Sequence, residues 1–164
     1  MKNENIREIS EVQDMQNIIP WLIFRLNEKI YTANSRYITS IVIKPDEVTR
    51  VPNVPKYIEG LIHLRGNVIP LINLKLLLKI GDNTENNTDE VKVNNEMVVV
   101  FEKENSFMGL VVDKVLSVEN ISKYEETEEL KRLNGNGFVT GVAKGYKTDD
   151  ILLVIDEEKI MQDA

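Results

Sequence analysis

Short apolar segments separated by polar turns recur along most of the chain. The first predict a hairpin with strands at 21–24 and 30–33, and then a β-branched strand at 37–43 that ends in a proline turn. Later apolar runs predict hairpins at 97–112 and 138–155, with a strand at 115–118 between them. This spacing of many short strands predicts a mainly β protein.

The segment 51–78 combines shape-setting residues with little reactive chemistry. Its first two prolines, three residues apart, predict an extended stretch over 51–55. Strands at 60–64 and 68–72 flank a turn at 65–67, which predicts a hairpin. Pro70 cannot donate to a strand ladder, so we expect it at a sheet edge or with its nitrogen facing outward.

The expected helices are short. Asn73 is placed to cap a helix over 74–80 that Gly81 stops, and Asp156 to cap a closing turn over 157–161. The charged residues 123–134 are a further helix candidate. Residues 1–18 are polar and predict a tail ahead of one domain over 19–162. The polar stretch 82–96 predicts a loop, in which Val91 and Val93 could start a strand.

A weak internal repeat underlies these elements. Each half has an apolar hairpin, a β-branched segment and a second hairpin, and the second hairpins open at Gly60 and Gly141. Each then leads into a short helix. This arrangement favours two small β-barrels over a single sandwich, and strands could be exchanged between the halves.

Composition narrows the function classes. The 164 residues carry 20 Lys and Arg against 27 Asp and Glu, and an acidic chain has no long-range attraction for nucleic acid. There is no cysteine for disulfide or thiol chemistry, and the lone histidine, His63, argues against zinc. We therefore expect neither metal nor cofactor. Asp113 is expected at a turn or strand end, and no carboxylate pair has spacing typical of acid–base catalysis.

Membrane insertion is also not expected. No apolar run approaches the roughly 20 residues that a spanning helix needs, and the N-terminal residues lack the apolar core of a signal peptide. We expect a cytoplasmic protein. An alternative from another class is a small β-barrel enzyme or ligand-binding protein, against which the absence of cysteine and the single histidine weigh.

Four segments in order carry a resemblance to a known family. Residues 58–74, IEGLIHLRGNVIPLINL, resemble the signature of CheW-like domains. Residues 48–52, 109–115 and 151–160 resemble further segments of that family. The family includes chemotaxis coupling proteins and the regulatory domain of the histidine kinase CheA.

The resemblance implies a fold and a function. The implied fold is two small SH3-like five-stranded β-barrels packed together, with short helices. The implied function is a non-enzymatic adaptor that couples the cytoplasmic tips of methyl-accepting chemoreceptors to the regulatory domain of CheA, recruited to membrane receptor arrays. An adaptor of another chemosensory-type pathway, controlling pili or development, is an alternative.

The resemblance also implies a receptor-binding groove but assigns no residue to the kinase contact. The groove residues it implies are Ile38, Ser40, Ile41, Gly60, Leu64, Arg65, Gly66 and Val68. Arg65 would order the receptor-facing hairpin. Two residues depart from the family pattern: Ser40 stands where a glutamate is usual, near the arginine, and Asn73 where an aspartate is usual. The first change would remove a charge-assisted hydrogen bond to Arg65.

Overall fold

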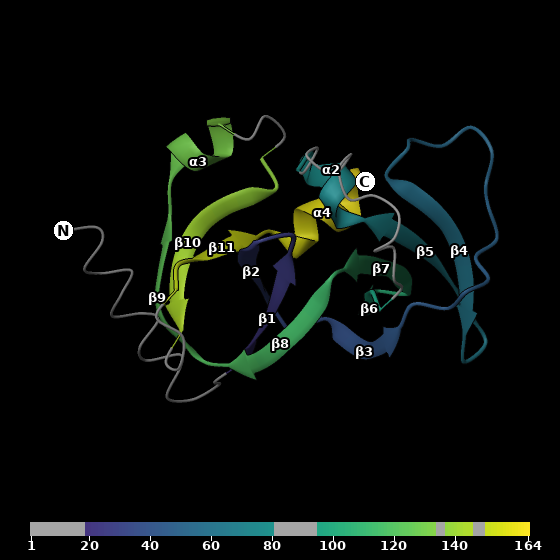
Figure 1. Cartoon of the computed structure of the whole chain (residues 1–164), viewed down its shortest axis with the longest axis horizontal. Coiled ribbons are helices and arrows are strands. Elements are labelled where there is room, and N and C mark those ends of the chain that lie inside the picture. Colours follow the sequence, from purple (N-terminus) through teal and green to yellow (C-terminus); the bar gives the residue numbers. More distant parts are fainter. Residues whose placement is uncertain (1–18, 81–94, 134–136, 146–149) are drawn as a thin grey trace.

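A computed structural model describes residues 19–80, 95–133, 137–145 and 150–164, which form two β-sheets with short helices (Figure 1). The strand order is β8-β1-β2-β11-β10-β9 in the six-stranded sheet and β3-β6-β7-β5-β4 in the five-stranded sheet. The prediction of a mainly β protein built from two small β units is confirmed, except that one unit has a sixth strand. The predicted tail at 1–18 and most of the predicted loop at 82–96 lie outside the described residues.

The strands are short and close to the predicted apolar runs. In the first half they are β1 (Trp21–Leu26), β2 (Lys29–Asn34), β3 (Ile38–Ile43), β4 (Ile58–Leu64) and β5 (Asn67–Asn73). In the second half they are β6 (Met97–Lys103), β7 (Ser106–Val112), β8 (Lys114–Glu119), β9 (Ile121–Glu126), β10 (Val139–Gly145) and β11 (Leu152–Ile155). The described helices are α2 (Leu74–Leu78), α3 (Glu128–Leu133) and α4 (Glu157–Asp163).

The two halves of the chain exchange their first hairpins. Hairpin β1–β2 joins strands of the second half, through an antiparallel pairing of β1 with β8 and a parallel pairing of β2 with β11. Hairpin β6–β7 joins strands of the first half in the same way, through β3 and β5. Each sheet is therefore completed by a hairpin from the other half, which is the exchange that the repeat left open.

The repeat extends to details of register. The edge strands β3 and β8, which pair with the exchanged hairpins, each have a register shift directly before a serine. After the shift, Ser40 of β3 lies opposite Val100 and Ser117 of β8 lies opposite Ile23. Both second hairpins shift register just before a glycine, Gly60 or Gly141. A Cβ on either glycine would clash with a backbone carbonyl of the neighbouring segment. The two glycines are required for the same close approach, at equivalent places in the two sheets.

Buried apolar side chains connect the two sheets. The largest cluster includes Phe24 from the six-stranded sheet and Phe101 from the five-stranded sheet, both 1% exposed, with Ile160 of α4. Smaller clusters lie within each sheet, one around Leu71 and one around Leu152. Since the main cluster draws on both sheets, burial of apolar surface holds the two together.

One predicted helix is in part a strand. The candidate at 123–134 is strand β9 up to Glu126, and α3 begins only at Glu128. Strand β9 forms because it pairs with β10 along one side, while the Tyr124 ring packs against the Trp21 ring with centroids 5.5 Å apart. The Thr127 hydroxyl accepts a hydrogen bond from the Leu130 amide at 3.0 Å and so caps the shortened helix.

Three local predictions in the segment 51–81 are tested by the backbone. The stretch 51–55 is a turn rather than extended, because Asn53 has φ +60°. Helix α2 ends at Leu78, and its C-cap Lys79 takes the left-handed conformation that was expected of Gly81. Pro70 lies on an interior strand opposite Leu61, whose N–H and C=O both bond to Thr49. The proline nitrogen therefore faces away from β4, on the side of β7, whose pairing with β5 begins only at the next residue, Leu71. The predicted edge position was wrong, and the missing donor is instead tolerated just before the β5–β7 pairing begins.

Candidate docking site

The β4–β5 hairpin ends in a tight turn of two residues. Its register closes at Leu64 opposite Asn67, so Arg65 and Gly66 form the turn, one residue fewer than predicted. Both have left-handed backbones, with φ +54° and +82°, which is the requirement of a type I′ turn. A Cβ on Gly66 would meet nothing within 4 Å. The turn therefore presents the Arg65 side chain to solvent, and Gly66 is needed for its backbone conformation alone.

Arg65 meets Ser40 across the open edges of the five-stranded sheet. Its Nη1 donates a hydrogen bond to the Ser40 Oγ at 3.4 Å. Because β3 and β4 are the two edge strands of that sheet, this contact requires the sheet to curl until its edges approach. The structure thus places the serine next to the arginine, where the resemblance located the missing carboxylate.

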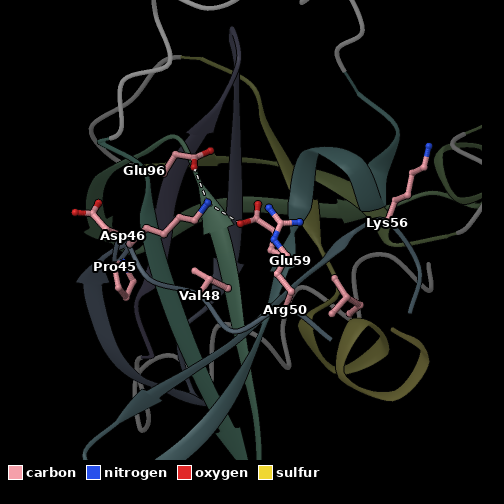
Figure 2. Close-up of a pocket in the computed structure, with 9 residues that line it drawn as sticks. Pro45, Asp46, Val48, Arg50, Lys56, Glu59 and Glu96 are labelled. Atoms are coloured by element: carbon pink, nitrogen blue, oxygen red, sulfur yellow. Dashed lines mark hydrogen bonds and ion pairs between the residues drawn. The ribbon is translucent and has the colours of Figure 1, made fainter. Parts of the chain in front are cut away.

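A second polar contact bridges the same two edges. Lys44, directly after β3, forms ion pairs with Glu59 of β4 at 2.6 Å and with Glu96 at 3.3 Å (Figure 2). The Asn73 amide donates to the other Glu59 oxygen at 2.8 Å. Burial lowers the pKa of Lys44, but the hydrogen bond and charge of Glu59 outweigh this, so its pKa is raised overall. No local sequence pattern indicates this bridge, because its partners are brought together only by the curl of the sheet.

The predicted groove residues divide by exposure. Ile41 and Val68 are exposed at 37% and 49%, whereas Ile38 and Leu64 are half-buried against the core clusters. Gly60 is buried and serves the close approach described above. Val68 lies on the hairpin that carries Arg65, and Ile41 directly follows Ser40 on β3. Isolated exposed apolar residues are ordinary, but these two belong to the segments that the Arg65–Ser40 contact brings together.

Two other residues singled out in the sequence have simple structural settings. Asp113 lies between β7 and β8, where its Oδ2 accepts a hydrogen bond from the Asn27 amide at 2.7 Å and its Oδ1 pairs with Lys75 at 3.0 Å. The expected strand-end role is confirmed. His63 is exposed on β4. Among the described residues, no three His, Cys, Asp or Glu side chains are grouped to hold a metal ion. Within the same residues, no helix is long and apolar enough to cross a membrane.

The fold and this surface together define a duplicated two-sheet β protein. The family model for CheW-like domains matches residues 20–164. The chain belongs to the CheW-like domain family, among its non-enzymatic chemotaxis scaffold proteins.

Individual relatives agree with that assignment. The chain is 30% identical over 144 residues to chemotaxis protein CheW of Thermotoga maritima, covering 87% of each chain. It is 27% identical over 154 residues to chemotaxis protein CheW of Helicobacter pylori, covering 93% of this chain and 87% of that protein. The crystal structure of the scaffolding protein TtCheW from Thermoanaerobacter tengcongensis superposes with a TM-score of 0.69 at 28% identity, over 84% of this chain and 88% of that one.

Proposed function

We propose that this chain is a coupling adaptor that links the cytoplasmic tips of chemoreceptors to the regulatory domain of the histidine kinase CheA. It would act as a single CheW-like domain over residues 19–162, in the cytoplasm at membrane receptor arrays. The proposed receptor-docking surface comprises β3 and the β4–β5 hairpin, with Ile38, Ser40, Ile41, Gly60, Leu64, Arg65, Gly66 and Val68.

The observation that supports this surface most is the contact of Arg65 with Ser40, which joins two segments that also carry the exposed side chains of Val68 and Ile41. We infer that the receptor tip docks as an amphipathic helix, through apolar anchors with polar contacts at the rim. Both kinds of group are present on the segments that meet at the Arg65–Ser40 contact, β3 and the β4–β5 hairpin. The polar pair would orient the partner, while the apolar side chains would contribute the buried area.

Binding to purified partners tests the proposal. We would measure binding of the full chain to a chemoreceptor cytoplasmic-tip fragment and, separately, to the CheA regulatory domain. We expect both to bind, and Val68→Asp to weaken receptor binding about tenfold or more by placing a charge against an apolar partner. Val118→Asp, the same substitution at an exposed valine on β8 of the other sheet, is the matched control. Unchanged receptor binding by Val68→Asp, or no binding by the folded unmodified chain, would contradict the proposal.

An adaptor of a chemosensory-type pathway that controls pili or development remains the second candidate. It would use the same surface with other receptors. Binding to receptor tips of one pathway and not the other separates the two.

A further inference from the structure

The chain passes between the two sheets at two short crossings, and each leads into an edge strand. The segment 35–37 connects β2 of the six-stranded sheet to β3, and Asp113 connects β7 of the five-stranded sheet to β8. Strands β3 and β8 each pair with only one neighbour, β6 and β1. The position of each edge strand therefore depends strongly on how its crossing is held.

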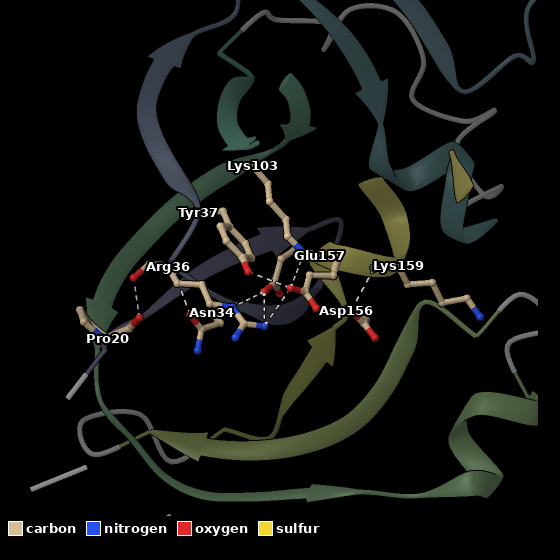
Figure 3. A network of polar contacts seen from close by, with 10 residues as sticks. Pro20, Asn34, Arg36, Tyr37, Lys103, Asp156, Glu157 and Lys159 are labelled. Atoms are coloured by element: carbon tan, nitrogen blue, oxygen red, sulfur yellow. Dashed lines mark hydrogen bonds and ion pairs between the residues drawn. The ribbon is translucent and has the colours of Figure 1, made fainter. Parts of the chain in front are cut away.

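Carboxylates of α4 hold the first crossing (Figure 3). One oxygen of Glu158 accepts hydrogen bonds from the Tyr37 hydroxyl and from Lys103 Nζ, both at 2.9 Å, and lies 3.7 Å from Arg36 Nη2. Arg36 also pairs with Glu157 at 3.5 Å. Glu157 is only 3% exposed, and burial raises the pKa of its carboxyl, an effect that the neighbouring Arg36 guanidinium opposes only in part.

The Tyr37 ring adds to this cluster. Arg36 and Lys103 lie 5.0 Å and 5.2 Å from the ring centroid, within range of cation–π attraction. The Tyr37 carbonyl accepts a hydrogen bond from the Glu102 amide at 2.8 Å. Tyr37 is thus fixed through its backbone, its ring and its hydroxyl, and β3 begins at the next residue.

The second crossing is held in the same way with the charges reversed. Helices α2 and α4 follow equivalent hairpins and start after the caps Asn73 and Asp156. The second residue of α4 is Glu158, and the second residue of α2 is Lys75, which pairs with Asp113 at 3.0 Å. The same position of each helix thus forms an ion pair with a crossing, and the Lys75–Asp113 pair is an observation independent of the Glu158 cluster.

We propose that Glu158 and Lys75 are positioning residues that clamp the two crossings, and that Glu158 in this way sets the edge strand β3 that carries Ser40 and Ile41. The effect on docking rests on the proposed function, whereas the effect on β3 does not. The C-terminal helix would then influence receptor binding without touching the receptor.

Hydrogen exchange of the folded chain tests the clamps directly. We expect Glu158→Ala to speed amide exchange in β3 about tenfold while β8 is unaffected, because local opening follows local contacts. Lys75→Ala should speed amide exchange in β8 and leave β3 unaffected. Glu158→Gln, which keeps an acceptor oxygen, should speed exchange in β3 less than Glu158→Ala does. Glu28→Gln, at an exposed turn, is the control. Unchanged exchange in β3, or equal acceleration in all strands, would overturn the clamp.

Receptor binding tests the consequence separately. With a receptor cytoplasmic-tip fragment as the probe, Glu158→Ala should weaken binding about fivefold, with partial recovery in Glu158→Gln. If the unmodified chain fails to bind the fragment, the proposed function fails and the exchange result still decides the clamp. If the unmodified chain binds and Glu158→Ala binds equally well, the positioning role is refuted.

Discussion

Replacing Ser40 with glutamate tests whether Arg65 can use a carboxylate at this position. The present contact is a long one between neutral hydroxyl and guanidinium, 3.4 Å from Ser40 Oγ to Arg65 Nη1. A glutamate side chain is two carbons longer and can rotate to bring its oxygens to hydrogen-bond distance. Buried charge-assisted bonds contribute roughly 1.5–3 kcal/mol. Arg65 is exposed on its turn, however, so we expect the free energy of unfolding to rise by only about 0.5 kcal/mol, as for surface pairs.

A double-mutant cycle isolates the pair. Urea unfolding would be measured for Ser40→Glu with and without Arg65→Ala, and for Ser40→Gln, which matches the length of glutamate without its charge. The gain in unfolding free energy should require both charges and should fall at about 1 M salt, where screening acts within roughly 3 Å. If receptor binding uses the ordered arginine, affinity should rise together with stability. An equal gain in Ser40→Gln, or in the Arg65→Ala background, would refute the reasoning.

The other predictions concern the backbone, a helix cap and pH. Gly60→Ala should lower the free energy of unfolding by roughly 3 kcal/mol or more, because φ is +146° and the new Cβ would clash with a backbone carbonyl. Gly66→Ala, in open space at φ +82°, should lower it by only about 1 kcal/mol. Equal costs of the two substitutions in urea unfolding would contradict this contrast. Asn73→Ala should cost about 2 kcal/mol, since it loses both the α2 cap and the hydrogen bond to Glu59. Asn73→Ser keeps a capping oxygen and loses the amide donor without placing a second carboxylate against Glu59, so a cost as large as that of alanine would show that the cap contributes nothing. The folded-state pKa of Lys44 is raised, so the stabilisation it contributes is fully present below the unfolded pKa of about 10.4 and is lost as pH rises through the folded pKa. In Lys44→Met, the free energy of unfolding should therefore fall less steeply with rising pH in the alkaline range. An unchanged slope would rule this out.

Sequence patterns located the elements whose causes are local. The Arg65-Gly66 turn and the Asn73 cap depend on residues within a few positions of each other, and both were predicted close to where they occur. Strand β9 was missed because its charged side chains show no alternation, and its stability depends on β10 and on the ring of Trp21. Pairing partners distant in sequence leave no local pattern to recognise.

The candidate site was likewise predictable only in part. The resemblance named Arg65 and Ser40, and the structure places them in contact. The Lys44–Glu59 bridge and the α4 carboxylates were not predicted. Both join segments that meet only because the sheet curls and the chain crosses between sheets. Ion-pair partners of this kind cannot be assigned from charge alone in a chain with 20 basic and 27 acidic residues.

Exchange of the first hairpins explains why such distant contacts matter for the proposed docking surface. Among the described strands, β3 pairs only with β6, which belongs to the second half of the chain, and β3 is reached by a crossing that contacts α4. Neither half contains a complete sheet, so the edge that carries Ser40 is assembled from residues of both. A change at the C-terminal helix can therefore reach β3 through one short crossing. In a protein with two self-contained sheets, the effect of the same substitution would reach β3 only through the packing interface between the sheets.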